Sequence, residues 1–171
     1  IKILSPMTPK EYILAYKNFM KDDDVYYISE HRLSYSNTKE FKNVVYENAD
    51  FTLFPFSVTR FESDKARVEL LKEGIRVNIL HQLWIKPFKI GKKKINILNS
   101  CKYGGIVLDD DYVEGMTSDI AHRLMINSDK KVFTMGLKPR SAGFHPRVDN
   151  LPPTSQEIIK KIKSIIKNFK G

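Results

Sequence analysis

The stretch GGIVLDDDYVEG, at positions 104–115, constrains the fold of this chain more than any other segment. Its apolar half is nearly continuous, which is typical of a strand buried on both faces in a parallel sheet. Three aspartates, Asp109 to Asp111, follow at the expected end of that strand. They could bind Mg²⁺ through carboxylate oxygens, or they could cap the following turn and helix near its positive N-terminus. The residues favour the capping interpretation and leave the magnesium interpretation open.

Strand-like and helix-like segments alternate along the rest of the chain. Strand candidates are short runs rich in β-branched and aromatic residues, and helix candidates repeat their apolar residues at a spacing of three or four. The predicted strands are IKIL, VYYIS, FTLFPFS, IRVNILHQL, GGIVLDD and KVFTMGL. Five helices are predicted. The first begins after Thr8, the second ends before Gly74, and the others lie at KKKINILNSCK, at residues 116–126 and at SQEIIKKIKSIIKNFK. This alternation predicts an α/β fold in which helices cover both faces of a mostly parallel sheet.

Several predicted helices carry recognisable end signals. Thr8, Pro9 and Glu11 combine an N-cap hydroxyl, a proline at the first helical position and the glutamate of a capping box. Gly74 is expected to end the second helix, and Thr154 or Ser155 is expected to begin the last one. The apolar stripe of that last helix consists of Ile158, Ile159, Ile162, Ile165, Ile166 and Phe169.

Size and composition restrict the class of protein. A chain of 171 residues, 42% of them hydrophobic, can bury a core and forms one domain or slightly more. No apolar run in the sequence is long enough to span a bilayer. The lone Cys101 excludes an internal disulfide and suits a reducing compartment, so we expect a cytoplasmic protein with a buried thiol. The sequence begins at Ile1 without a signal peptide, and we expect it to be a piece of a longer chain.

The formal net charge of +9 makes nucleic-acid binding a hypothesis. The lysines are scattered or lie on expected helix faces, and the sequence has no zinc-finger spacing, RNA-recognition signature or basic–aromatic platform. The densest basic segment, IGKKKINIL, is interpreted as the solvated start of a helix. Nucleic-acid binding is therefore disfavoured and is kept as an alternative.

Motifs that carry chemistry by themselves are missing from the sequence. It contains no GxGxxG, Walker loop, HExxH or CxxC, and no serine is framed as a nucleophile elbow. The four histidines are far apart along the chain, so the sequence does not indicate a metal site built from them. Any functional inference therefore depends on the order of the segments.

Four segments, taken in order, carry a resemblance to a known family. They are SPMTPKEYILAYKNFMKDDDVYYISEHRLSY, ADFTLFPFSVTRFESDKARVELLKEGIRVNILHQLWIKPF, GGIVLDDDYVEGMTSDIAHRLM and KVFTMGLKPRSAGFHPRVDNLPPTSQEIIKKIKSI. Together they resemble the β subunit of thiamine-diphosphate-dependent 2-oxo acid dehydrogenases and, more widely, the transketolase superfamily. The departures are the missing glycine in PFSVTRF, QLW in place of the usual LR, and a single Gly115 where two glycines are common.

The resemblance implies a division of the chain. Residues 1–36 would close an aminopyrimidine-binding domain, residues 37–49 would be a linker, and residues 50–171 would form a three-layer α/β/α transketolase C-terminal domain. Thiamine diphosphate and Mg²⁺ would be bound mainly outside this chain, whose own role would be structural and subunit-contacting, without catalytic residues.

The resemblance also implies partners. The expected partner is an alpha-type or diphosphate-binding subunit or domain, in a homodimer or an α2β2 assembly. Docking to a lipoyl-bearing acyltransferase core is a weaker expectation, because a +9 chain matches the basic docking modules of such cores poorly. Two other functions stay open, namely a non-catalytic assembly module of the same fold and a basic α/β nucleic-acid-binding domain.

A further implication of the resemblance is an ion site. Family members hold a potassium ion at the turn after the last helix of the aminopyrimidine domain, and the matching positions are Phe19 (main-chain carbonyl), Asp22 and Asp24. Hard oxygen ligands suit such a cation, and the alternative is an exposed acidic turn. His31, next to Glu30, is expected to form a polar pair at the edge of a sheet, and the alternative is that it approaches the cofactor cleft.

Overall fold

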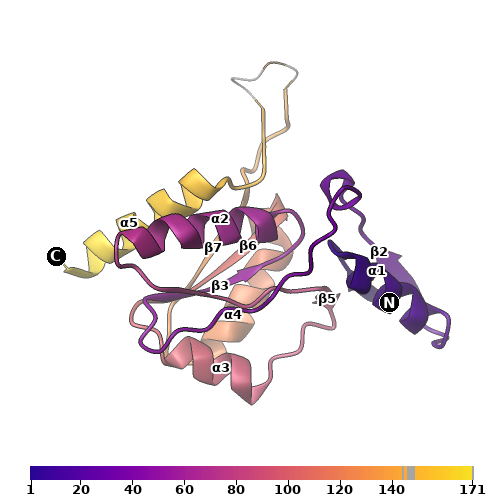
Figure 1. The fold of residues 1–171 in the computed structure, drawn as a ribbon, viewed down its shortest axis with the longest axis horizontal. Helices are drawn as coiled ribbons and strands as arrows, with labels where there is room; N and C mark the ends of the chain where they lie inside the picture. The colour runs from indigo at the N-terminus through magenta and orange to yellow at the C-terminus, as the bar shows by residue number, and fades with distance from the viewer. Residues whose placement is uncertain (144, 146–148, 171) are drawn as a thin grey trace.

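The computed structural model describes residues 1–143, 145 and 149–170. These residues form two sheets that share no strand. The larger sheet carries helices on both faces, and the smaller sheet lies to one side together with the N-terminus (Figure 1). Within the described ranges, no helix combines the length and the apolar character needed to cross a membrane.

The N-terminal arm, which we define as residues 1–35, supplies most of the smaller sheet. Strands β1 (Lys2–Leu4) and β2 (Tyr26–Ile28) are parallel, and α1 (Pro9–Phe19) connects them. A short helical turn, η1 (Arg32–Ser34), ends the arm. The strand–helix–strand order expected for this segment is therefore confirmed.

The larger sheet is entirely parallel and has the strand order β4-β3-β6-β7. Its strands are β3 (Phe51–Pro55), β4 (Val77–Ile79), β6 (Gly104–Tyr112) and β7 (Val132–Leu137). The central pair β3 and β6 is buried along most of its length. The nearly continuous apolar run of β6 follows from that burial, because both faces of the strand are covered.

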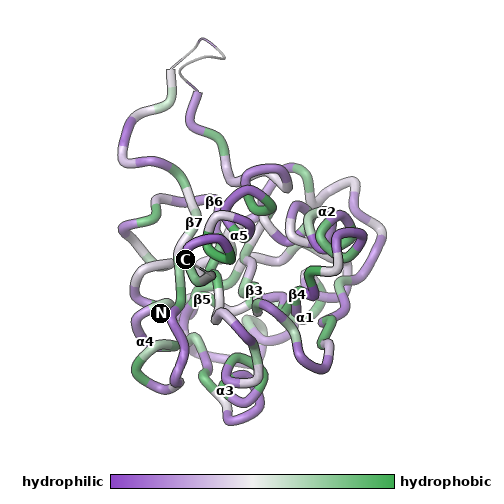
Figure 2. Tube along the Cα trace, turned by 90° about the vertical axis from the view of Figure 1, so that its left-hand side faces the viewer, coloured by the Kyte–Doolittle hydropathy of each residue, from purple (hydrophilic) through white to green (hydrophobic). Residues whose placement is uncertain are grey.

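Two helices cover each face of this sheet. Helices α2 (Thr59–Lys72) and α5 (Ser155–Lys170) lie on one face, and α3 (Lys92–Asn99) and α4 (Ser118–Ile126) lie on the other (Figure 1). Apolar and polar residues alternate along these helices, as expected of helices with one buried side (Figure 2). The predicted α/β fold with a mostly parallel sheet between two helical layers is confirmed.

The end signals read from the sequence form the expected contacts. The Thr8 hydroxyl accepts a hydrogen bond from the Glu11 N–H at 3.4 Å, and the Glu11 carboxylate accepts one from the Met7 N–H at 3.0 Å. Thr154 begins α5 in the same way, since its hydroxyl accepts from the Glu157 N–H at 3.3 Å. Gly74 follows the C-cap of α2 with a left-handed φ of 77°, a conformation that favours glycine.

The strand observed within IRVNILHQL is much shorter than predicted, and a further strand follows it. Strand β4 ends at Ile79, and the chain then crosses to the smaller sheet as β5 (Trp84–Lys86), antiparallel to β1. The sequence pattern missed β5 because its partner lies about eighty residues earlier in the chain, and local periodicity carries no information about so distant a partner. β5 thus connects the arm to the larger sheet and its four helices, which together we call the larger domain.

Residues 37–49, expected as a linker, run along the edge strand of the larger sheet. Val44 and Ile79 exchange two backbone hydrogen bonds of 2.9 and 2.8 Å. The Asn43 amide oxygen accepts from the His81 N–H at 2.9 Å, and the Asn78 amide oxygen accepts from the Tyr46 N–H at 2.7 Å. These contacts give the segment a defined path along β4.

The helix expected over residues 116–126 begins two residues later than predicted. A wide helical turn, η2 (Val113–Thr117), precedes α4, and Gly115 in that turn has non-helical angles of φ −89° and ψ −127°. The Val113 carbonyl accepts hydrogen bonds from the Thr117 and Ser118 hydroxyls at 2.9 and 2.6 Å. The glycine-containing turn expected after the aspartates is therefore present, and the regular helix starts after it.

Candidate functional site

The carboxyl ends of β3 and β6 lie side by side at the point where the strand order of the larger sheet reverses. From β3 the chain moves to β4 on one side and later returns to β6 on the other. In parallel α/β sheets this reversal creates a crevice outside the strand ends, where ligands commonly bind. Ser57 follows β3 at this point, and Asp109 and Asp110 lie in the second half of β6.

Ser57 connects β3 to α2 with an unusual backbone. Its φ of 45° lies in the left-handed region, which favours glycine. The family resemblance led us to expect a glycine at this place in PFSVTRF. Ser57 stands there instead and has the positive φ that a glycine would adopt most easily. The Ser57 hydroxyl donates a 2.6 Å hydrogen bond to Asp110 Oδ2, which ties the turn to the end of β6.

His31 approaches the same carboxylate from the N-terminal arm. Its Nε2 lies 4.0 Å from Asp110 Oδ2, and its Nδ1 accepts a hydrogen bond from the Leu33 N–H at 3.2 Å. Nδ1 is therefore the acceptor nitrogen and cannot take a proton from Ser57, whose hydrogen is already directed to Asp110. The three groups do not form a serine nucleophile with a general base.

The expected pairing of His31 with Glu30 is wrong. The Glu30 carboxylate instead accepts hydrogen bonds of 3.1 Å from the Tyr16 and Tyr35 hydroxyls. His31 is directed across to the end of β6, because the turn η1 orients it there through Leu33.

Asp109 is the buried member of the acidic cluster. Its side chain is almost fully enclosed, with the residue 4% exposed. Burial, with a further contribution from the neighbouring Asp110 charge, raises the pKa of Asp109 to about 8. Protonation of this carboxyl group therefore competes with the binding of a divalent cation, which needs the carboxylate form.

The acidic cluster matches neither sequence interpretation fully. The Asp111 carboxylate accepts a 2.7 Å hydrogen bond from the Tyr112 N–H, where the following turn begins. Helix α4 itself has no side-chain cap. In the part of the chain that the structure describes, no cluster of three or more His, Cys, Asp or Glu residues could hold a metal ion. The magnesium interpretation of Asp109 to Asp111 therefore has no structural support.

The three residues proposed for potassium lie together in the turn after α1. The Phe19 carbonyl accepts from the Asp22 N–H at 3.4 Å, and Asp22 Oδ1 accepts from the Asp24 N–H at 3.0 Å. The Lys2 ammonium contacts Asp22 Oδ2 and lies 2.9 Å from Asp24 Oδ2. A potassium ion bound by these carboxylates would have to displace that ammonium.

Lys2 also stabilises the charged form of Asp22 in this turn. Its hydrogen bond is the largest cause that lowers the pKa of Asp22 to about 2, and the same contact raises the pKa of Lys2. The Tyr26 hydroxyl donates a further 2.8 Å hydrogen bond to Asp22 Oδ2. Potassium binding at Phe19, Asp22 and Asp24 remains a prediction.

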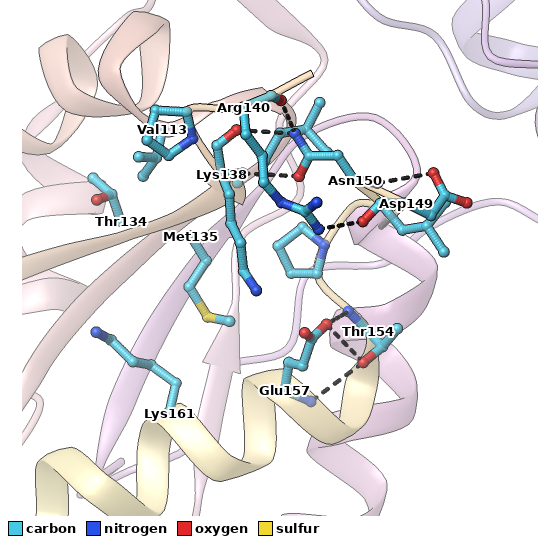
Figure 3. Close-up of a pocket in the computed structure, with 15 residues that line it drawn as sticks. Val113, Thr134, Met135, Lys138, Arg140, Asp149, Asn150, Thr154, Glu157 and Lys161 are labelled. Carbon is cyan, nitrogen blue, oxygen red and sulfur yellow. Dashed lines mark hydrogen bonds between the residues drawn. The ribbon is translucent and has the colours of Figure 1, made fainter. Parts of the chain in front are cut away.

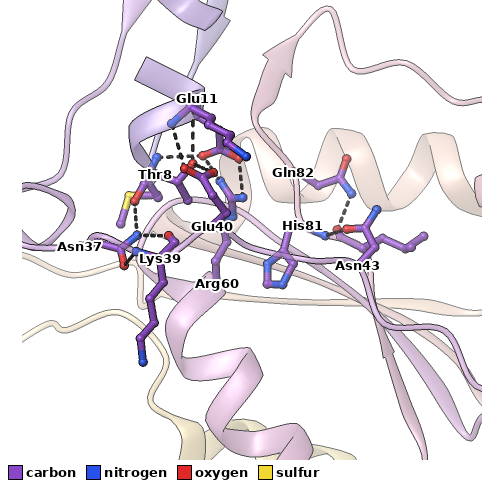
Figure 4. Close-up of polar contacts among 12 residues, drawn as sticks. Thr8, Glu11, Asn37, Lys39, Glu40, Asn43, Arg60, His81 and Gln82 are labelled. Carbon is purple, nitrogen blue, oxygen red and sulfur yellow. Dashed lines mark hydrogen bonds and ion pairs between the residues drawn. The ribbon is translucent and has the colours of Figure 1, made fainter. Parts of the chain in front are cut away.

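A buried ion pair fastens the arm to the larger domain beside these strand ends. Arg60, which is 1% exposed, donates hydrogen bonds of 2.8 and 2.6 Å to the two carboxylate oxygens of Glu11 (Figure 4). Its guanidinium also lies 4.2 Å from the ring centroid of Phe41, which stacks on His81 at 4.5 Å. Glu40 reinforces the contact by accepting from the Thr8 hydroxyl at 2.6 Å.

Sequence reasoning missed this pair. Arg60 stands in a helix rich in exposed charges, and nothing in its local pattern distinguishes it from a surface residue. Glu11 was recognised through its capping role, and the structure shows that the same carboxylate also neutralises Arg60. Only the approach of α1 to the start of α2 reveals the second role.

A separate hollow of about 790 Å³ lies between the end of β7, the following loop and the start of α5 (Figure 3). Its polar groups are largely engaged with one another. The Asn150 amide donates to the Lys138 and Arg140 carbonyls at 2.9 and 2.7 Å, and Arg140 donates to the Asp149 carbonyl at 2.5 Å. These contacts stabilise the loop and mix charges of both signs, so they do not define a preference for one ligand.

Comparison with known proteins places this geometry in a wider context. No family model matches the sequence, and no curated protein matches it. Among solved structures, one described as a split gene transketolase, an inactive beta4 tetramer, matches with a TM-score of 0.67 at 15% identity. The match covers 97% of this chain and 57% of that chain. The fold is transketolase-like.

A second structure agrees over a shorter region of this transketolase-like chain. It is a 2-oxoglutarate:ferredoxin oxidoreductase from Magnetococcus marinus with 2-oxoglutarate, coenzyme A and succinyl-CoA bound. The TM-score is 0.52 at 19% identity, over 72% of this chain and 19% of that chain. The chain thus spans little more than half of one matched structure and a fifth of the other, and at these identities the likeness shows the fold alone.

Proposed function

We propose that this chain is the C-terminal portion of a thiamine-diphosphate-dependent enzyme of the transketolase superfamily, nearest to the β subunit of 2-oxo acid dehydrogenases. Its own role is structural and subunit-contacting. The transketolase-like fold over 97% of the chain supports this proposal. Thiamine diphosphate and Mg²⁺ are then bound mainly by residues outside the chain, and the cofactor supplies the electron sink for decarboxylation or cleavage of the substrate.

The observation that carries the proposal is the apolar surface of the N-terminal arm. Of the 18 large hydrophobic residues found exposed in the described chain, 10 belong to the arm. Exposed apolar surface of this density marks an interaction site in a folded protein. The ten residues are Ile1, Ile13, Leu14, Tyr16, Phe19, Met20, Val25, Tyr27, Leu33 and Tyr35.

The partner surface we assign to this arm is a diphosphate-binding subunit or domain, in a homodimer or an α2β2 assembly. On α1, Ile13, Tyr16 and Met20 line one shallow apolar groove, which suits an apolar partner surface. The strand ends of the larger sheet support the non-catalytic role, because Ser57, Asp110 and His31 are not arranged as a nucleophile with its base.

The test is reconstitution with the diphosphate-binding partner, followed by thiamine-diphosphate-dependent decarboxylation of 2-oxo acids with a dye as electron acceptor. The double variant Ile13→Glu/Met20→Glu is expected to abolish co-elution with the partner and the activity, because two charges would be buried in the contact. The matched control is Val68→Glu, which places the same charge on an exposed apolar position of α2. It is expected to leave assembly and activity unchanged.

Three results would contradict the proposal. Tight binding of thiamine diphosphate to the isolated chain, measured by calorimetry, would contradict its structural role. Normal assembly of the double variant would contradict the role of the arm. Normal assembly without activity on any 2-oxo acid or ketose would instead support the non-catalytic assembly module.

A further inference from the structure

A cavity of about 520 Å³ opens between the chain that leaves β4 and the start of α3. This volume is in the range of small-molecule sites. Its charged lining groups are Lys89, Lys93 and Lys94, and none of its lining residues is acidic. Leu83, Trp84 and Ile97 form an apolar part of the wall. We call it the α3 cavity.

Lys94 is the half-buried cation of the α3 cavity. Its ammonium donates hydrogen bonds to Gln82 Oε1 at 2.7 Å and to the Lys89 carbonyl at 3.0 Å, and it lies 4.4 Å from the Phe88 ring centroid. These partners are all neutral, and burial lowers the pKa of Lys94 to about 8. The structure therefore maintains a desolvated positive charge without an anion to compensate it.

The other cavity lysines also lack carboxylate partners. Among the described residues, the ion pairs include none with Lys89, Lys93 or Lys94. Asp22 lines an adjoining hollow together with Lys89, but Lys2 already neutralises it. The sequence predicts IGKKKINIL as a solvated helix start. Lys92 and Lys93 are exposed as expected, whereas Lys94 is partly covered by Gln82 and Lys89.

The start of α3 also carries positive charge without a compensating anion. Three lysines occupy its first turn, no acidic residue is present there, and Gly91 provides no side-chain cap. Cations are unfavourable at a helix N-terminus, where the partial charge is positive. A bound anion would offset both this repulsion and the burial of the Lys94 charge.

We propose that the α3 cavity binds the phosphate group of a small phosphorylated molecule, whose organic part packs against Leu83, Trp84 and Ile97. Lys89, Lys93 and Lys94, which all line the cavity, bind the phosphate oxygens with charge-assisted hydrogen bonds. This site is distinct from the apolar surface of the arm and does not depend on the proposed enzyme assembly.

The test is calorimetric titration of the full chain with phenyl phosphate and with inorganic phosphate at pH 8 and low salt. Both are expected to bind, phenyl phosphate more tightly, with affinities that fall as NaCl screens the lysines. Lys93→Gln removes an exposed lysine of the site and is expected to weaken binding roughly tenfold. Lys167→Met removes the same charge from an exposed position on α5 and is the matched control.

Proton uptake provides a second measurement for Lys94. Binding of an anion favours the charged form of an amine that is partly neutral at pH 8, so the chain is expected to take up protons. Titrations in buffers of different ionisation enthalpy measure this uptake, and Lys94→Met is expected to abolish it. Lys93→Gln is expected to retain it.

Several outcomes would overturn the proposal. One is equal weakening by Lys167→Met and Lys93→Gln, which would indicate attraction to net charge alone. Another is the absence of binding by both probes. A third is binding of single-stranded DNA with neither probe bound, which would indicate a nucleic-acid surface in place of a small-molecule site.

Discussion

Asp109 and Arg60 are both almost completely buried, yet burial has opposite consequences for their charges. Asp109 has an acidic neighbour, so burial and repulsion both favour its neutral form. Arg60 carries a guanidinium, which stays charged in proteins, and the carboxylate of Glu11 at 2.6 Å compensates that buried charge. The burial of Asp109 and the pairing of Arg60 with Glu11 both depend on segments far apart in the sequence, so neither could be predicted from the sequence.

Asp109→Asn tests the protonation state at the end of β6. Since the pKa of Asp109 is raised from 3.8 to about 8 in the folded chain, its favourable contribution is complete below pH 4 and is lost as the pH rises through 8. Relative to wild type, the asparagine variant is therefore expected to gain stability as the pH rises from 4 to 9. Urea denaturation across this range measures the difference.

Asp129→Asn is the control for that comparison, because Asp129 is exposed and is not among the groups that raise the pKa of Asp109. Its stability is expected to follow the wild-type pH profile. If Asp109→Asn followed that profile too, the raised pKa of Asp109 would be contradicted.

Lys2→Met tests the ion site of the arm. Without the ammonium, Asp22 and Asp24 lose the cation that they contact, so a potassium ion has less to displace. The melting temperature of the variant is expected to be higher in potassium than in tetramethylammonium salts of equal ionic strength, by a larger margin than in wild type. Lys21→Met, in the same turn, is the control. A larger potassium effect in wild type than in Lys2→Met would contradict the prediction.

At the scale of single elements, the agreement between sequence prediction and structure depends on how much of the packing is local. Helix α5 follows its sequence closely, because a stripe of isoleucines at helical spacing has one way to be buried against the sheet. Strand β4 is shorter than the predicted strand IRVNILHQL, because the chain leaves the larger sheet after Ile79 and turns toward β1. The hydrophobic period of a segment thus predicts whether it is a helix or a strand more reliably than it predicts where that element ends.

Ile162→Ala tests the packing of α5. Ile162 is fully buried in the core between α5, α2 and the sheet, so the shortened side chain leaves a cavity. The loss of unfolding free energy is expected to be about 2–5 kcal/mol, measured by urea denaturation. Lys160→Ala, at an exposed position of the same helix, is expected to change stability by less than about 0.5 kcal/mol. A similar small loss for Ile162→Ala would contradict the observed burial.

At the scale of the whole molecule, the arm is held to the larger domain by segments far apart in the sequence. Strand β5 pairs with β1, and Glu11 pairs with Arg60. The Asp110–Ser57 contact lies beside this junction, with His31 directed toward it from the arm. The arm therefore approaches the carboxyl ends of β3 and β6 from one side.

Glu11→Gln tests this junction. It leaves the buried guanidinium of Arg60 without a charged partner, so a loss of about 3 kcal/mol or more is expected in urea denaturation. Cleavage of the arm by a protease is expected to accelerate in parallel. Glu69→Gln breaks an exposed ion pair with Lys72 and is expected to cost less than about 1 kcal/mol. Equal losses in the two variants would show that Arg60 does not depend on Glu11.

The sequence by itself determined most elements of this protein, although not β5, and the class of its fold. The continuous apolar run of β6, the isoleucine stripe of α5 and the end signals at Thr8, Gly74 and Thr154 are local, and each specifies its own segment. The tertiary structure decided which distant groups meet. It joined β5 to β1, paired Arg60 with Glu11 and enclosed Asp109 and Lys94. Local periodicity reports that one face of a segment is buried, whereas charge state and ligand preference depend on the groups that other segments bring against that face.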